Sequence, residues 1–184
     1  MRESEFKTQV FTLRDGRALA YIDFGPDAGN PVFYFHGCPS SRYEGEFAAV
    51  HAAKFGFRII AIDRPGMGMS GFQQNRKFRD WPGDVCALAD HLGIGRFGVA
   101  GHSGGGPFIY VCAHEIPERL TCAVAFCPWG PVSDEAMYKT LNSLDRGYFK
   151  IAEKMPWLMR ATFTPLGMMA KQFPELFFSI MKRS

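Results

Sequence analysis

The sequence lacks the features that mark nucleic-acid-binding and membrane proteins. Its 21 Lys and Arg residues are nearly balanced by 18 Asp and Glu residues, and no block of like charge occurs along the chain. A net charge of only +3 gives no reason to expect a nucleic acid as partner. No apolar run approaches the roughly eighteen residues of a membrane span, and charges occupy the start where a signal peptide is apolar. We therefore expect a soluble, cytoplasmic protein with no membrane partner.

The five cysteines are poorly arranged for disulfides or for a metal. Their number is odd and they form no C-x-x-C pair; they are Cys38, Cys86, Cys112, Cys122 and Cys127. Disulfide frameworks use even numbers of cysteines, and structural zinc sites usually use paired ones. We therefore predict no metal site, and the pattern is typical of a reducing compartment.

Short β-rich runs alternate with amphipathic stretches up to about residue 129, an order that builds a mainly parallel sheet covered by helices. Six strands are predicted, at residues 10–13, 19–24, 32–35, 58–62, 97–100 and 122–126, the first two forming a hairpin. Helices are predicted over 42–55, with Phe47, Val50 and Ala53/Lys54 on its inner edge, and over 85–92 with Asp80 as a cap. A third is predicted after Ser103, to about Glu115. The fold class is therefore α/β, with about six strands flanked by helices.

The composition changes beyond Pro131. Strands vanish, Met and aromatic residues become frequent, and Pro156, Pro165 and Pro174 are expected to divide the segment into short helices. We therefore divide the chain into a sheet-containing unit, residues 1–130, and a helical unit, residues 131–184.

The most informative stretch is a predicted strand that leads into Gly-His-Ser-Gly-Gly and then into a helix. A serine on so sharp a turn needs residues without bulk two positions to either side, and Gly101 and Gly105 meet that need. The turn would lift Oγ of Ser103 to a helix N-terminus, where developing negative charge is stabilised. Ser103 is the candidate nucleophile and the N–H of Gly104 a candidate oxyanion donor; the alternative is a glycine-rich turn with an idle serine.

A second motif, His36-Gly37-Cys38-Pro39, directly follows the third predicted strand. Gly37 lets the loop fold back toward the site, and the N–H of Cys38 is the natural second oxyanion donor because Pro39 has none. His36 ends a buried strand, so we interpret it as a structural residue that fixes its loop rather than as a base. The Cys38 thiol has no evident histidine partner and is expected to pack as a small apolar group.

A third motif closes the fourth predicted strand, where Gly66, Gly68 and Gly71 spell the G-x-G-x-x-G of dinucleotide-binding proteins. Residues 72–77 open no apolar helix at whose N-terminus a pyrophosphate could lie, and no βαβ unit begins the chain. We therefore reject a dinucleotide and predict no cofactor.

The three motifs, in this order and spacing, resemble the α/β-hydrolase fold family over roughly residues 10–184. The resemblance implies that Ser103 is the nucleophile, that the amides of Cys38 and Gly104 form the oxyanion hole, and that His102 packs beside the serine. It also implies a helical cap after the sixth strand, followed by an acid and a histidine on later strands. Those strands are not present, so we expect an incomplete hydrolase fold, truncated within the cap, in which no histidine takes the base position.

The leading hypothesis is a serine hydrolase that cleaves an ester or related acyl bond through an acyl-Ser103 intermediate. Without its acid and base, this 184-residue chain is expected to be inactive or very weak. Asp134 is a position that some relatives use for the acid, but we expect it to cap a surface helix. The alternative is a non-catalytic protein that keeps the fold and binds a small ligand or a partner chain.

Two expectations concern partners. An apolar acyl substrate would fit Met and aromatic side chains of the cap segment, for which plain packing is the alternative: Met155, Trp157, Leu158, Met159, Phe163, Met168, Met169, Phe173, Phe177 and Phe178. Residues 122–126 would form an exposed apolar edge strand, from which we expect self-association.

Overall fold

The computed structural model describes residues 7–130 and 134–181. The chain divides into two compact units, Met1–Gly130 and Pro131–Ser184. The first unit contains the sheet and the second contains only helices in its described part, so each is treated by itself below.

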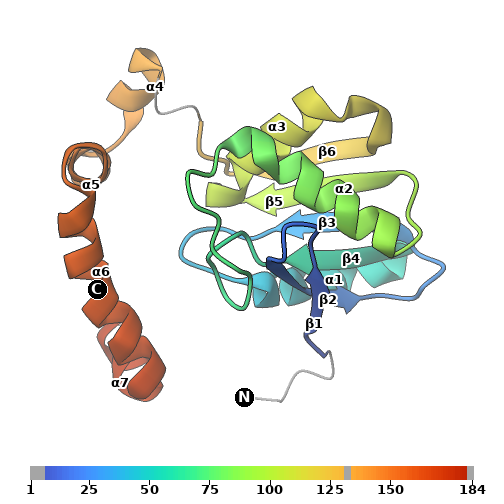
Figure 1. The fold of residues 1–184 in the computed structure, drawn as a ribbon, viewed down its shortest axis with the longest axis horizontal. Coiled ribbons are helices and arrows are strands. Elements are labelled where there is room, and N and C mark those ends of the chain that lie inside the picture. The colour runs from blue at the N-terminus through green and yellow to red at the C-terminus, as the bar shows by residue number, and fades with distance from the viewer. Residues whose placement is uncertain (1–6, 131–133, 182–184) are drawn as a thin grey trace. The chain divides into compact units, whose positions relative to one another are not determined.

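The first unit is built on a six-stranded sheet with the spatial order β1-β2-β4-β3-β5-β6 (Figure 1). The strands are β1 (Gln9–Thr12), β2 (Ala18–Phe24), β3 (Asn30–Phe35), β4 (Phe57–Ile62), β5 (Phe97–His102) and β6 (Leu120–Phe126). β1 and β2 form the predicted hairpin and β2 runs antiparallel to β4, whereas β4, β3, β5 and β6 are parallel. The predicted α/β fold with a mainly parallel sheet is confirmed.

Helices lie on both faces of this sheet (Figure 1). α1 (Gly45–Ala52) packs on one face, and α2 (Trp81–His91) and α3 (Gly106–Glu115) pack on the other. Five single-turn 3₁₀ helices complete the unit: Arg42–Glu44, Ala53–Phe55, Phe78–Asp80, Ser103–Gly105 and Pro117–Arg119. Because both faces of β3 and β4 are covered, these strands are continuous apolar runs rather than alternating ones.

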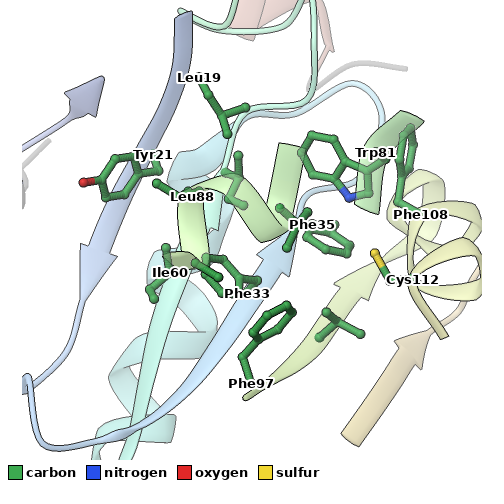
Figure 2. Close-up of a cluster of buried hydrophobic side chains, with 14 of the residues drawn as sticks. Leu19, Tyr21, Phe33, Phe35, Ile60, Trp81, Leu88, Phe97, Phe108 and Cys112 are labelled. Atoms are coloured by element: carbon green, nitrogen blue, oxygen red, sulfur yellow. The ribbon is translucent and has the colours of Figure 1, made fainter. Parts of the chain in front are cut away.

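The larger core cluster fills the space between the sheet and the pair α2 and α3 (Figure 2). Trp81 at the start of α2 packs edge-on against Phe35 of β3 and Phe108 of α3, with ring centroids 5.2 and 5.6 Å apart. Phe33 and Phe97 make a similar contact at 4.8 Å. These rings hold the beginnings of α2 and α3 above the end of β3, where the candidate site lies.

The face of α1 that contacts the sheet is not the expected one. Phe47 and Val50 are 82% and 61% exposed, whereas Gly45 and Ala49 are buried. A Cβ at Gly45 would lie only 2.4 Å from Cβ of Ala61, so the helix lies too close to the sheet for large residues. The prediction of an inner edge at Phe47 and Val50 was therefore wrong, because small side chains form the contact.

The cap that we expected for α2 serves a different turn. The carboxylate of Asp80 accepts a hydrogen bond from the N–H of Lys77 at 2.8 Å, which caps the 3₁₀ turn Phe78–Asp80. It makes no capping bond to α2, whose start instead carries Pro82 in its first turn.

The described part of the second unit consists of α4 (Glu135–Thr140), α5 (Ser143–Lys154), α6 (Pro156–Gln172) and α7 (Pro174–Met181). Asp134 caps α4 by accepting a hydrogen bond from the N–H of Met137 at 2.9 Å. Pro156 and Pro174 begin helices, but Pro165 lies inside α6, so the prediction that it breaks the segment was wrong. Residues 131–133 fall outside the described residues. Among the helices described, none is long and apolar enough to cross a membrane.

Candidate active site

Ser103 occupies a strained bend between β5 and α3. Its φ of +49° lies in the left-handed region, which side-chain-bearing residues seldom adopt. β5 ends at His102 and α3 begins at Gly106, with one 3₁₀ turn between them. The half-buried serine therefore lies beside the N-terminus of a ten-residue helix, as the strand–turn–helix pattern predicts.

Two glycines let this bend lie against the backbone of β3. A Cβ at Gly105 would lie 2.2 Å from the carbonyl oxygen of Phe35, and a Cβ at Gly101 would lie 2.6 Å from the same oxygen. No real side chain tolerates either distance, so only glycine fits at both positions. The glycines thus fix the height of Ser103 above the sheet edge.

The loop after β3 brings Cys38 to the elbow. A Cβ built at Gly104 would lie 3.3 Å from the backbone nitrogen of Cys38 and 3.1 Å from its Cβ. The corresponding point at Gly37 lies 3.5 Å from Cβ of Ser103. The structure therefore brings together Cys38 and Gly104, the residues whose amides are the candidate oxyanion donors, and places the loop of Gly37 beside the serine. Two main-chain donors that point to one position can stabilise an oxyanion that develops there.

Glu44 holds the same loop from its other side, a role that the sequence did not reveal. Its carboxylate accepts hydrogen bonds from the N–H of Gly37 at 3.0 and 3.2 Å and from the hydroxyl of Tyr34 at 2.9 Å. Burial opposes its ionisation, but hydrogen bonds from Ser40, Tyr34 and Gly37 together lower the pKa of Glu44. The imidazole of His102 lies beside this carboxylate, with Nδ1 3.5 Å from Oε1 of Glu44.

His36 is fully buried and connects two loops. Its Nε2 accepts a hydrogen bond from the N–H of Arg64 at 3.3 Å, so the proton is assigned to Nδ1, which lies 2.8 Å from the carbonyl oxygen of Gly37. Burial, with the nearby charge of Arg64, lowers the pKa of His36, so the ring is neutral. These contacts fix the loop of Gly37 to that of Arg64, and none of them reaches Ser103.

The carboxylate of Asp63 holds the glycine-rich loop after β4 in a compact turn. Asp63 is fully buried, forms an ion pair with Arg42, and accepts hydrogen bonds from the N–H groups of Arg42 at 2.7 Å and Met69 at 2.9 Å. A Cβ at Gly68 would lie 1.9 Å from that carboxylate. The next helical residues, Phe78–Asp80, form a single 3₁₀ turn. The glycines therefore serve a compact turn around Asp63.

No imidazole of the described residues, which include all five histidines, forms a hydrogen bond with Oγ of Ser103. His91 instead stacks on Phe11, with ring centroids 4.6 Å apart, and His114 lies beside Glu115. Across residues 7–130 and 134–181, no three His, Cys, Asp or Glu side chains are grouped to hold a metal.

Comparison with known proteins agrees with this arrangement. The family model described as alpha/beta hydrolase fold matches residues 30–163. The bifunctional esterase/perhydrolase of Acinetobacter calcoaceticus is 35% identical over 136 residues, which are 73% of this chain and 48% of that protein. The non-heme chloroperoxidase of Streptomyces lividans is 34% identical over 123 residues, which are 66% of this chain and 45% of that protein.

A solved structure gives the same result. The epoxide hydrolase CorEH without ligand superimposes with a TM-score of 0.58 at 28% identity, over 65% of this chain and 42% of that one. The chain thus spans about half the length, or less, of the relatives that it matches. Since the family model covers most of the chain and the sheet and elbow agree with it, this chain belongs to the α/β-hydrolase fold family.

Proposed function

We propose that Ser103 is the nucleophile of a hydrolase that cleaves an ester or related acyl bond. The observation that supports this most directly is the elbow itself, a serine at φ +49° near the neighbouring residues Cys38 and Gly104. Such a strained conformation persists only where the surrounding structure imposes it, and it is commonest at functional sites.

The chemistry follows from these positions. Oγ of Ser103 attacks the carbonyl carbon, and the carbonyl oxygen becomes an oxyanion that accepts hydrogen bonds from the N–H groups of Cys38 and Gly104. The bond to the leaving alcohol then breaks, and the alcohol departs with the proton that Oγ has lost. Water hydrolyses the acyl-serine ester, which releases the acid and restores the hydroxyl of Ser103. Loss of one oxyanion donor typically slows such a reaction by about 10² to 10³-fold.

A serine at position 103 favours acyl chemistry over epoxide opening, although epoxide hydrolases occur among the similar proteins. A serine that opened an epoxide would form an ether, which water does not readily cleave. An acyl-serine ester is hydrolysed and returns the nucleophile. We further propose an apolar acyl group as substrate, on the ground that Met and aromatic residues are frequent in residues 131–184.

The 184-residue chain should be a weak catalyst by itself, because among the described residues no imidazole hydrogen-bonds to Ser103. The same observation favours the second candidate function, a non-catalytic protein that uses the hydrolase fold to bind a small ligand or a partner chain. The two functions differ in whether Ser103 can be acylated at all.

Acylation with an external base tests the proposal. The chain is incubated with p-nitrophenyl acetate, with and without imidazole, and the acetylated peptide is identified by mass spectrometry. We expect imidazole to promote acetylation of Ser103 at least tenfold over that of Ser143, an exposed serine at the start of α5. Equal labelling of the two serines would support the binding protein instead.

Two variants complete this experiment. Gly104→Val should abolish acetylation of Ser103, because a side chain there would lie on the nitrogen of Cys38. Without imidazole, turnover should be slow and should depend little on Ser103. Fast hydrolysis that is lost in Ser103→Ala would show that a base within the chain has been overlooked.

A further inference from the structure

Arg64 is buried directly behind the candidate oxyanion hole. The residue is 5% exposed, and its guanidinium lies over the ring of Phe108 at 5.0 Å from the centroid. Within the described residues it forms no ion pair with a carboxylate, and its Nε has no hydrogen-bond partner. A buried charge without a carboxylate partner is costly, and an apolar side chain could fill the same space beside Phe108. Packing alone therefore does not account for an arginine here.

The two shortest side-chain hydrogen bonds of Arg64 go to the main chain of the hole, while Nη2 also lies 3.5 Å from Nδ1 of His36 and the guanidinium interacts with the side chain of Cys38. Nη2 donates a hydrogen bond to the carbonyl oxygen of Gly37 at 2.7 Å, and Nη1 donates one to the carbonyl oxygen of Gly104 at 3.3 Å. One planar guanidinium thus connects the loop that carries Cys38 with the elbow that carries Ser103. A fork of fixed geometry is suited to holding two oxygens at a set separation.

The carbonyl group of Gly37 and the N–H group of Cys38 belong to the same peptide group. A charged donor at the carbonyl oxygen polarises that group and makes its N–H a stronger donor, an effect that is larger in a buried setting. The second candidate donor is arranged in a similar way, because the N–H of Trp129 donates to the carbonyl oxygen of Ser103 at 3.0 Å. That carbonyl shares a peptide group with the N–H of Gly104. Only the first peptide group receives a charged donor.

We propose that Arg64 is a positioning residue of the oxyanion hole, whose guanidinium orients and polarises the Gly37–Cys38 peptide group and ties it to the elbow. The inference rests on the proposed acyl chemistry at Ser103, but it also predicts a property of the Cys38 amide that is measurable without any reaction. Arg64 itself touches no substrate in this arrangement.

The kinetic test uses the slow hydrolysis of p-nitrophenyl acetate by the 184-residue chain. Serine hydrolases that have lost a triad member keep an acceleration of about 10³ to 10⁴-fold from the oxyanion hole and binding, so the residual rate reports on the hole. Arg64→Met should lower kcat about tenfold, less than the loss of a whole donor, and leave KM unchanged. The kcat of Arg64→Lys should lie between those of the parent chain and Arg64→Met, because an ammonium keeps the charge but cannot connect both carbonyls.

Arg76→Met is the matched control. The guanidinium of Arg76 also lies over the ring of Phe108, 5.3 Å from the ring centroid. Unlike Arg64, it makes no hydrogen bond to Gly37 or Gly104. This variant should stay within twofold of the parent rate. Equal losses in Arg64→Met and Arg76→Met would mean that the cluster around Phe108 acts only through stability, and would overturn the proposal.

The second readout is the amide proton of Cys38, followed by NMR in the unreacted chain. Arg64→Met should move this resonance upfield, whereas Arg76→Met should leave it in place; Arg64→Lys serves if the Met variant does not fold. An unchanged Cys38 resonance in a folded Arg64 variant overturns the proposal, whatever the rates. A shifted resonance in a chain whose Ser103 is not acetylated even with imidazole would support the role of Arg64 and contradict the proposed function.

Discussion

At the scale of single residues, the site depends on space that side chains leave free. The carbonyl oxygen of Phe35 lies 2.2 Å from the point where a Cβ of Gly105 would be. The atom in the way belongs to the backbone of β3, which cannot move without disturbing the sheet. The left-handed bend at Ser103 and the glycine two positions later are therefore one structural requirement.

Gly105→Ala should destabilise the protein by about 2 kcal/mol or more, because the added methyl group overpacks a backbone contact. Gly83→Ala is a suitable control, since Gly83 lies in α2 with nothing within 4 Å of its Cβ position. That substitution should stabilise the helix by about 0.5 to 1 kcal/mol. Urea unfolding measures both changes, and similar free energies for the two variants would contradict the explanation.

Residues whose roles depend on neighbours in sequence were predictable, and those that depend on distant partners were not. The bend at Ser103 follows from a pattern of five consecutive residues. Glu44 and Arg64, by contrast, look like ordinary surface charges in the sequence. Their partner Gly37 lies 7 and 27 positions away, and Gly104 lies 40 positions from Arg64. Only the folded sheet brings these groups together.

At the scale of elements, the order of strands followed from their short apolar runs, but the packing of α1 did not. Periodicity locates an amphipathic helix without saying how closely it approaches the sheet.

At β6, the expectation of an apolar edge strand agrees with the pairing, since among the described strands β6 pairs only with β5. Val124 and Phe126 on this strand are 39% and 52% exposed.

We propose that the chain self-associates through β6, because an exposed apolar edge strand offers unpaired backbone groups to another copy. Sedimentation velocity should show oligomers whose fraction rises with concentration. Val124→Lys should shift the distribution toward monomer by several-fold, whereas Val10→Lys on β1, the opposite edge strand, should not. A compact monomer at all concentrations would contradict this expectation.

At the scale of the whole molecule, buried ionisable groups connect the loops of the first unit. Arg17 forms a two-pronged ion pair with Asp84 of α2 at 2.7 and 2.9 Å, and Arg42 pairs with Asp63. Removal of one partner from such a pair leaves a buried charge uncompensated. The fold should therefore respond to pH through its interior as well as its surface.

Stability should fall as the pH is lowered from neutrality. The pKa of His36 is lowered in the folded state by burial, so the unfolded chain takes up this proton first and the stability contribution is lost as the pH falls below about 6.5. The lowered pKa of Glu44 adds a further loss at more acidic pH. Urea midpoints measured between pH 8 and 5 should decline.

Two histidine variants test whether His36 causes the decline of the urea midpoint near neutral pH. His36→Asn removes the buried titrating group, so its midpoint should vary less between pH 7.5 and 5.5 than that of the parent chain. His51→Asn changes an exposed histidine at α1 and should keep the parental slope. The same slope in all three proteins would show that His36 does not govern it.

The register of the parallel strands has a consequence for the accuracy of the site. Phe35 of β3 pairs with Ile62 of β4 on one side and with Gly101 of β5 on the other. These three residues form one cross-strand row at the ends of the strands from which the three loops start. Cys38, Arg64 and Ser103 each follow this row by two or three residues. A slip of one strand by a single residue would displace its group by about 3.3 Å, more than the length of a hydrogen bond. The strand pairing of the sheet therefore sets the relative positions of Ser103, the candidate nucleophile, and of Cys38 and Arg64.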